Sequence, residues 1–168
     1  GVNLQLDYDH SIPKIVKCDL LRLKQILINL INNSIKFTNE GFIKIVITLI
    51  DQNESELKIK FEIQDSGIGI TEENKTKLFE KFFQVNEVNT EGSGLGLSIV
   101  RNLTEKMGGT IDFTSEYGVG SSFFFEIPLH VGTKVAPIND NTSKASQNEK
   151  LSILLVEDNE INRMIGIK

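Results

Sequence analysis

The stretch Asp65-Ser66-Gly67-Ile68-Gly69-Ile70 follows directly on an apolar run and predicts the point where a strand ends in a glycine turn. Glycines two residues apart allow positive φ and let the backbone approach a flat ligand closely. A carboxylate at a strand end accepts hydrogen bonds, for instance from an exocyclic amine such as that of adenine. Because an ordinary turn uses glycines in the same way, the stretch has to be interpreted together with the rest of the chain.

The composition is that of an ordinary globular protein, since 39% of the 168 residues are hydrophobic and 24% are charged. The net charge of −5 provides no basic surface to gather nucleic acid or an anionic membrane. The single cysteine, Cys18, excludes an internal disulfide framework and a cysteine-rich zinc site. Neither His10 nor His130 has metal-ligand spacing with another histidine or cysteine.

No apolar run approaches the ~20 residues that span a bilayer, and the first residues do not resemble a signal peptide. We therefore expect this segment to lie in water and to make no direct contact with a membrane. A cytoplasmic location is therefore expected, which also fits the cytoplasmic part of a larger, membrane-bound protein.

Hydrophobic periodicity predicts an α+β domain over residues 1–130. Asp19 is a candidate N-cap, and apolar residues at spacings of three and four predict a helix that ends near residues 37–39. Further helices are predicted over residues 71–83 and 96–107. Strands are predicted over residues 2–8, which should be half-buried, and over residues 42–50, 57–63, 110–116 and 121–129. This order predicts an antiparallel or mixed sheet with helices on one face.

The composition changes after residue 130. Residues 131–150 are rich in small and polar residues such as Asn and Ser and have almost no large apolar side chains, which predicts a flexible linker. The apolar run that begins at Leu151 predicts a buried strand, and Glu157 and Asp158 follow it at once. We expect residues 151–168 to be the start of a second domain.

A polar column lies on the first long helix. Asn29, Asn33 and Lys36 occupy positions i, i+4 and i+7 and therefore share one face. An amide oxygen is a hard ligand that suits Mg²⁺, and a lysine supplies positive charge to phosphate oxygens. Two carboxamides and an ammonium in this arrangement can bind a polyphosphate and its metal, although for the column alone a solvated helix face is the favoured explanation.

Two segments between the glycine turn and the last helix complete the pattern. Gly92-Ser93-Gly94-Leu95-Gly96 opens a predicted helix, where free N–H groups and the positive helix end suit phosphate. The segment is neither a P-loop nor a Rossmann fingerprint, because the spacing differs from both. Phe79 and Phe82 lie three apart and are expected to be core anchors that also hold the base of a mobile loop over residues 84–93.

In order and spacing, four segments resemble the N, G1, F and G2 boxes of the ATP-binding catalytic domain of sensor histidine kinases. They are residues 29–38, 65–69, 79–82 and 92–96, and the resemblance covers about residues 1–130. It implies the Bergerat fold, a two-layer α/β sandwich in which three helices cover a mixed sheet and a lid closes over ATP.

The resemblance also implies roles for individual residues. Asn33 would ligate Mg²⁺, while Asn29 and Lys36 would complete the catalytic set at the phosphates. Asp65 would bind the adenine amine. The other implied ATP-binding residues are Gly67, Gly69, Phe79, Phe82, Gly92, Gly94, Leu95 and Gly96. Two departures from the family pattern are Ser34, where Ala is usual, and Glu91, where Gly is frequent.

Asn29 discriminates between reactions. The ATPase relatives and the anti-sigma serine kinases carry Glu at this position, where it acts as a general base on water or a hydroxyl. Asn cannot take up a proton, whereas a histidine acceptor brings its own nitrogen lone pair. The resemblance therefore implies an ATP-dependent protein histidine kinase rather than a hydrolytic ATPase. A nucleotide-binding signalling module without activity is the alternative, disfavoured by the intact site residues.

The phosphoacceptor histidine is expected outside this chain, because His10 precedes a turn at Ile12-Pro13 rather than lying on a helix. The implied partner is an upstream phosphoacceptor and dimerisation domain. Residues 153–162 resemble the first strand and acidic loop of a receiver domain, in which Glu157 and Asp158 would help hold Mg²⁺. This implies a hybrid kinase of a two-component phosphorelay, with a receiver in cis or a separate response regulator as its partner.

Overall fold

The computed structural model describes residues 1–84 and 94–132, which lie within one compact unit, Gly1–Lys134. The elements are β1 (Val2–Tyr8), β2 (Val16–Lys17), α1 (Leu20–Phe37), β3 (Gly41–Gln52), β4 (Glu56–Asp65), α2 (Glu72–Lys75), α3 (Gly96–Lys106), β5 (Thr110–Glu116) and β6 (Gly120–Val131). The α+β class, the five predicted strands and the two long helices are confirmed. Only the short β2 was not predicted. Residues 85–93 and 133–168 lie outside the described ranges, so the linker and the second domain stay predictions.

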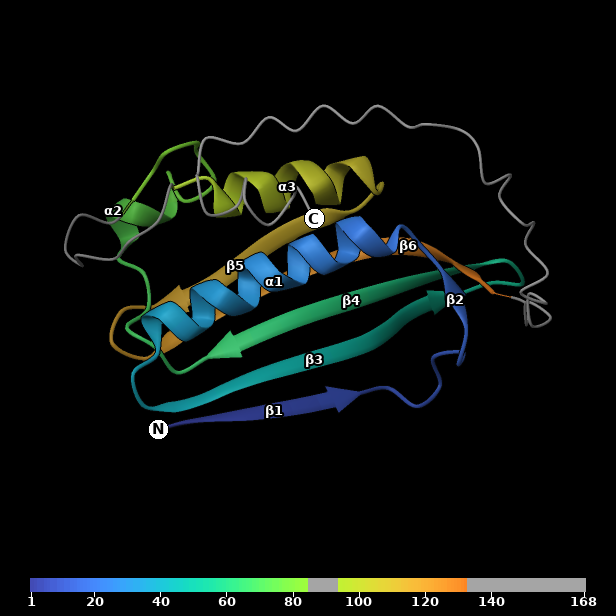
Figure 1. Ribbon diagram of the computed structural model, residues 1–168, viewed down its shortest axis with the longest axis horizontal. Coiled ribbons are helices and arrows are strands. Elements are labelled where there is room, and N and C mark those ends of the chain that lie inside the picture. Colours follow the sequence, from blue (N-terminus) through green and yellow to red (C-terminus); the bar gives the residue numbers. More distant parts are fainter. Residues whose placement is uncertain (85–93, 133–168) are drawn as a thin grey trace, which may run out of the picture. The chain divides into compact units, whose positions relative to one another are not determined.

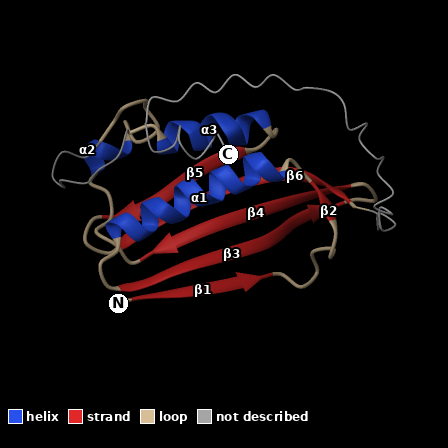
Figure 2. Cartoon of the chain, viewed as in Figure 1, coloured by secondary structure: helices blue, strands red, loops and turns tan. Residues whose placement is uncertain are grey.

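The strands form one mixed sheet in the order β1-β3-β4-β6-β2, with β5 pairing to β6 off this path. β1 and β3 are parallel, and the remaining pairs are antiparallel. Figure 1 shows α1 and α3 lying side by side across one face of this sheet, and Figure 2 separates the helical layer from the strands by colour. The structure therefore has the two layers that the resemblance implies. None of the helices in the described ranges has the length and apolarity needed to cross a membrane.

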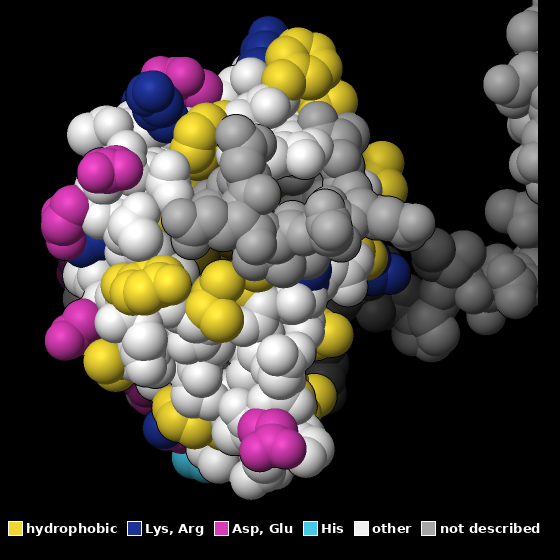
Figure 3. Space-filling view, turned by 90° about the vertical axis from the view of Figure 1, so that its left-hand side faces the viewer, with side chains coloured by type: hydrophobic (Ala, Val, Ile, Leu, Met, Phe, Trp, Pro, Cys, Tyr) yellow, Lys and Arg dark blue, Asp and Glu magenta, His cyan; other side chains and the backbone are white. Residues whose placement is uncertain are grey.

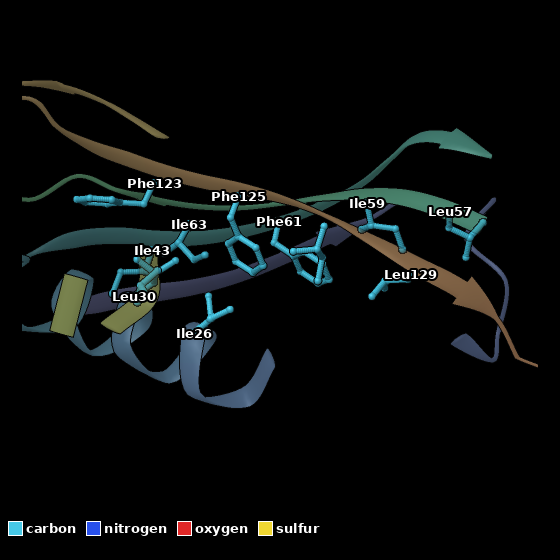
Figure 4. Packing of buried hydrophobic residues seen from close by; sticks show 12 residues of the cluster. Ile26, Leu30, Ile43, Leu57, Ile59, Phe61, Ile63, Phe123, Phe125 and Leu129 are labelled. Carbon is cyan, nitrogen blue, oxygen red and sulfur yellow. The ribbon is translucent and has the colours of Figure 1, made fainter. Parts of the chain in front are cut away.

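The first long helix, α1, begins and packs as its sequence predicts. Asp19 is its N-cap, and the carboxylate Oδ1 accepts a hydrogen bond of 3.0 Å from the Arg22 N–H. Ile26 and Leu30, four residues apart, are fully buried against the sheet (Figure 4). Because these two residues fix the rotation of the helix, its polar column is carried to one side of the core.

The core lies between the helices and one face of the sheet. Burial alternates from residue to residue along β4, and along β6 from Phe123 to Leu129, so every second side chain there points towards the helices. The rings of Phe61 and Phe125 stack at a centroid distance of 4.9 Å in the middle of this layer. The buried hydrophobic side chains of the sheet, most of which are labelled in Figure 4, are Ile43, Leu57, Ile59, Phe61, Ile63, Phe123, Phe125, Ile127 and Leu129.

The prediction that residues 2–8 form a half-buried strand is right about the strand and wrong about burial. The side chains of Leu4 and Leu6 are 66% and 65% exposed. β1 lies at the edge of the sheet and pairs only with β3 (Figure 1). Alternation shows which residues share a face, but it does not show whether that face is covered by another element.

The predicted helix over residues 71–83 is also wrong in extent, because α2 ends after one turn, at Lys75. Phe82 has a φ of +65°, which no helix residue adopts, and its N–H donates to the Gly94 carbonyl at 3.0 Å. Its side chain is 72% exposed, so it is not a core anchor. Phe79 is half-buried, and its ring lies edge-on to that of Phe113 at a centroid distance of 5.8 Å.

Candidate functional site

A cavity of about 240 Å³ lies where α1, the end of β4 and the β5–β6 hairpin meet. This volume falls just below the ~300–1,000 Å³ of typical ligand pockets, and so it suits a flat base better than a whole nucleotide. Figure 3 views this end of the molecule, where hydrophobic side chains lie exposed among polar ones. The lining residues are Asn33, Ser34, Phe37, Asp65, Ile68, Gly69, Ile70, Thr71, Asn74, Leu78, Leu97, Tyr117, Ser121 and Phe123.

Asp65 is the buried acidic group of the cavity and is only 8% exposed. As the last residue of β4 it pairs with Ile43 of β3 and Ser121 of β6, so the sheet register fixes its position. Its Oδ1 accepts hydrogen bonds from the backbone N–H groups of Gly67, at 3.0 Å, and of Ser121, at 3.3 Å. Its Oδ2 accepts a hydrogen bond from the Ser34 hydroxyl at 3.1 Å.

Burial raises the pKa of Asp65 above its ordinary value, because the charged form loses contact with water. The hydrogen bonds from Gly67, Ser34 and Ser121 act in the opposite direction and stabilise the charge. Since these three partners are all donors, the carboxylate is an acceptor towards any group that enters the cavity.

The glycine turn after Asp65 is held between the end of α1 and the β5–β6 hairpin. The Ile68 N–H donates to the Phe37 carbonyl at 3.2 Å, and the Ile68 carbonyl accepts from the Gly118 N–H at 2.7 Å. The Ile70 N–H donates to Ser115 Oγ at 2.9 Å. The turn is therefore a fixed wall of the cavity.

Both glycines of this turn are required by close backbone approaches. A Cβ on Gly67 would lie 2.5 Å from the carbonyl oxygen of Phe37. Gly69 has a φ of +68°, and a Cβ there would overlap the carbonyl oxygen of Glu116. The two predicted glycines thus shape the wall, and Gly69 also lines the cavity.

The three residues of the predicted polar column on α1 lie at different positions relative to the cavity. Asn33 lines the cavity. Asn29, one turn earlier, lies beside the first turn of α3, since a Cβ on Gly96 would be 3.6 Å from its Oδ1. Lys36 is half-buried outside the cavity lining, with its Nζ 5.1 Å from the centroid of the Phe37 ring.

The predicted G2 segment is described from Gly94 onward. Gly94 has a φ of +68° and approaches the backbone of Phe82, so close that a Cβ would lie 2.7 Å from its carbonyl carbon. Leu95 occupies the N-cap position, and Gly96 begins α3. Gly92 lies outside the described residues.

The remaining predicted site residues are not brought into the cavity. Phe79 and Phe82 are absent from its lining among the described residues. Glu157 and Asp158, predicted to hold a receiver magnesium, lie beyond the part of the chain that is described.

The donor set of the cavity fits a magnesium ion that shares its ligands with a substrate. Mg²⁺ takes oxygen ligands, keeps several waters and is commonly held by one or two side chains together with substrate phosphates. The amide oxygen of Asn33, on the cavity wall, meets this requirement. Within residues 1–84 and 94–132, no three Asp, Glu, His or Cys side chains gather to form a site of their own.

Most of the lining residues lie outside the set that the sequence predicts to bind a ligand, and two of them, Ser34 and Ser121, donate hydrogen bonds to Asp65. Two sequence signals point to Ser34: it adjoins Asn33, and it departs from the family pattern, in which Ala is usual at this position. Ser121 acts through its backbone N–H, which reaches Asp65 across the β4–β6 register and cannot be inferred from its local sequence.

Comparison with known proteins gives one family and a consistent set of relatives. The family model described as histidine kinase-, DNA gyrase B- and HSP90-like ATPase matches residues 18–131. Hybrid signal transduction histidine kinase B of Dictyostelium discoideum is 41% identical over 172 aligned positions, covering 100% of this chain and 8% of that protein. The autoinducer 2 sensor kinase/phosphatase LuxQ of Vibrio cholerae is 37% identical, covering 99% of this chain and 20% of LuxQ. The chain thus spans less than a quarter of the length of either relative.

Two solved structures resemble the fold. Full-length ShkA in complex with AMPPNP superposes with a TM-score of 0.67 and 32% identity, over 79% of this chain and 26% of ShkA. The nucleotide-free catalytic domain of histidine kinase ThkA has a TM-score of 0.61 and 36% identity, over 76% of this chain and 78% of that domain.

Proposed function

Since this chain belongs to the family of histidine kinase-, DNA gyrase B- and HSP90-like ATPases, we propose that it binds Mg·ATP and transfers the γ-phosphoryl group to a histidine. The acceptor histidine is expected on an upstream phosphoacceptor and dimerisation domain. One observation carries the proposal: the buried Asp65 carboxylate and the Asn33 carboxamide line the same cavity.

Asp65 supplies the recognition of the base. Its Oδ2 accepts a hydrogen bond from the exocyclic amine of adenine, and its Oδ1 is already occupied by two backbone N–H groups. A flat base lies between apolar side chains in such a pocket. The apolar side chains that line it are Phe37, Ile68, Ile70, Leu78, Leu97 and Phe123.

The phosphates extend from the base towards the polar column of α1. Asn33 holds Mg²⁺ through its amide oxygen, Asn29 supports the same site, and the flexible stem of Lys36 brings its ammonium to a phosphate oxygen. Bound Mg²⁺ supplies charge neutralisation for the transferred group. The backbone of Gly94, Leu95 and Gly96 lies at the start of α3, where N–H groups and the positive helix end favour phosphate.

Transfer to histidine is favoured over hydrolysis by the residue at position 29. Asn29 cannot act as a general base, which water would require and a neutral imidazole would not. The sequence relatives that align with the whole chain are named as histidine kinases or sensor kinases, which agrees with this choice.

The wider arrangement is proposed by the same reasoning. Hybrid histidine kinase B aligns over this entire chain, including residues 151–168. We infer that a receiver domain begins at residue 151, with Glu157 and Asp158 in its magnesium site, after the linker over residues 131–150. Such a kinase works in the cytoplasm and passes its phosphoryl group to a receiver in cis or to a separate response regulator.

Two measurements test the proposal. Titration calorimetry with Mg·ATP should give measurable heat, and Mg·ATP should raise the midpoint of thermal unfolding. An added phosphoacceptor-helix domain should then acquire acid-labile label from γ-labelled ATP. The absence of both heat and a thermal shift would refute nucleotide binding. Release of free phosphate without labelling of the added domain would instead assign the chain to the hydrolytic ATPases.

A further inference from the structure

Ser34 is a buried hydroxyl at the base-binding end of the cavity. It is 2% exposed, it lines the cavity, and its Oγ lies 3.1 Å from Asp65 Oδ2. It follows Asn33 directly on α1, and the proposed binding of phosphate and metal does not use it. Its position beside the carboxylate therefore calls for a separate explanation.

The direction of the hydrogen bond between Ser34 and Asp65 is fixed by chemistry. An ionised carboxylate has no hydrogen to give, so the serine hydroxyl is the donor. A hydroxyl has one hydrogen and two lone pairs. Once that hydrogen is committed to Oδ2, the serine can offer only lone pairs to a ligand in the cavity.

The other carboxylate oxygen is already used. Oδ1 accepts from the N–H groups of Gly67 and Ser121, so Oδ2 is the oxygen left for a ligand. Ser34 is the side-chain donor that holds Oδ2, and together with the two N–H groups on Oδ1 it fixes the rotation of the carboxylate about its Cβ–Cγ bond. The edge of the base consequently meets two adjacent acceptors, Oδ2 and Oγ.

We propose that Ser34 is a specificity-determining residue, which positions Asp65 and makes the site select bases that present an amino group over bases that present a carbonyl. The inference rests on the proposed nucleotide function and extends it from binding to discrimination. A 6-amino group can donate towards both acceptors. A 6-oxo group would place a third acceptor against them, and a buried acceptor without a donor is costly.

Comparison of ATP with inosine triphosphate, which carries a carbonyl at position 6, tests this inference. The wild-type chain, Ser34→Ala and Ser122→Ala are titrated with each nucleotide in the presence of Mg²⁺. Ser122 is the matched control, because its hydroxyl also donates to a carboxylate, Glu62 Oε1 at 2.7 Å, and it does not line the cavity. Ser34→Ala should weaken ATP binding about tenfold and leave inosine triphosphate binding unchanged, as expected for one hydrogen bond to a charged group.

Each outcome decides a different claim. If Ser34→Ala leaves the ratio of the ATP and inosine triphosphate affinities unchanged, whether both are weakened equally or neither is weakened, Ser34 is only structural and the inference is overturned. A wild-type chain that binds neither nucleotide would overturn the proposed function and the inference with it. Ser34→Cys, which is close in size but a weak donor, repeats the test if the alanine variant unfolds at a lower temperature.

Discussion

Asp65 and Glu62 are two carboxylates on β4 that lie on opposite faces of the sheet. Each accepts a hydrogen bond from a serine hydroxyl, Ser34 at 3.1 Å for Asp65 and Ser122 at 2.7 Å for Glu62. Burial raises the pKa of Asp65. Burial also acts to raise the pKa of Glu62, but hydrogen bonds from Gln64, Lys60 and Ser122 outweigh it and lower that pKa to about 2.

Beside the neutral donors Gln64 and Ser122, Glu62 also has a cation as a partner. Lys60 Nζ lies 2.8 Å from Glu62 Oε2, whereas the described donors to Asp65 are neutral. On the outer face of the sheet, the Glu62 carboxylate has an ammonium as its partner, and this ion pair stabilises the sheet. When neutral donors alone hold a buried carboxylate, its negative charge is only partly compensated, and it can accept a further hydrogen bond from a ligand. Such carboxylates are typical of binding sites.

The two groups respond to pH in opposite directions. The folded pKa of Glu62 lies below its unfolded value of 4.5, so its stabilisation is present above pH 4.5 and is lost as pH falls towards 2. The folded pKa of Asp65 lies above 3.8, so the folded state binds the proton more readily and gains stability as pH falls through this region. Asp65 therefore destabilises the folded protein in its charged form, which is the form that accepts the adenine amine.

The largest effect is expected from Asp65→Asn. The amide of Asn has one NH₂ group in place of a carboxylate oxygen. In one orientation this NH₂ replaces the acceptor that the adenine amine needs, and in the other it faces the backbone N–H groups that donate to Oδ1. ATP binding should therefore weaken about a hundredfold. Glu62→Gln, on the outer face, is the control and should change ATP affinity less than about twofold. Titration calorimetry measures both. An unchanged preference of Asp65→Asn for ATP over GTP would remove Asp65 from base recognition.

A smaller effect is expected on stability, when alanine replaces a glycine in the tightly packed cavity wall, Gly69, or one in an open turn, Gly118. Gly69→Ala forces a Cβ onto the Glu116 carbonyl at positive φ and should lower the free energy of unfolding by about 3 kcal/mol. Gly118 also has a positive φ, +83°, but no atom lies within 4 Å of a Cβ placed there. Gly118→Ala should therefore cost only backbone strain of about 1 kcal/mol. Urea unfolding gives both values, and equal losses would contradict the close approach at Gly69.

The smallest effect is expected from Glu62→Gln on stability. Since the carboxylate is partly exposed and its ion pair is screened by solvent, the loss at pH 7 should be about 1 kcal/mol. This difference from the wild type should shrink below pH 4.5 and vanish only below pH 2, where the wild-type carboxylate is protonated in the folded state as well. Urea unfolding at several pH values measures it. A difference that stays constant with pH would show that Glu62 stabilises the sheet by packing rather than by charge.

The local sequence predicts those helices and strands whose apolar residues recur with a clear helical or strand spacing. The helix from Leu20 to Phe37 forms as expected because its cap residue, Asp19, and its apolar stripe agree. The segment around Phe82 lacks such agreement. There a contact with Gly94 imposes a left-handed backbone, and this tertiary contact overrides helix propensity.

The sequence by itself determined the α+β class, the family and the residue types of the site, because these are carried by periodicity and by the order of four short motifs. Only the tertiary structure decided which residues meet. It left the apolar face of β1 exposed, and it kept Phe79 and Phe82 out of the cavity lining among the described residues. It also joined Ser34 and Ser121 to Asp65, since hydrogen bonds between distant segments depend on sheet register and helix rotation, which no local pattern records.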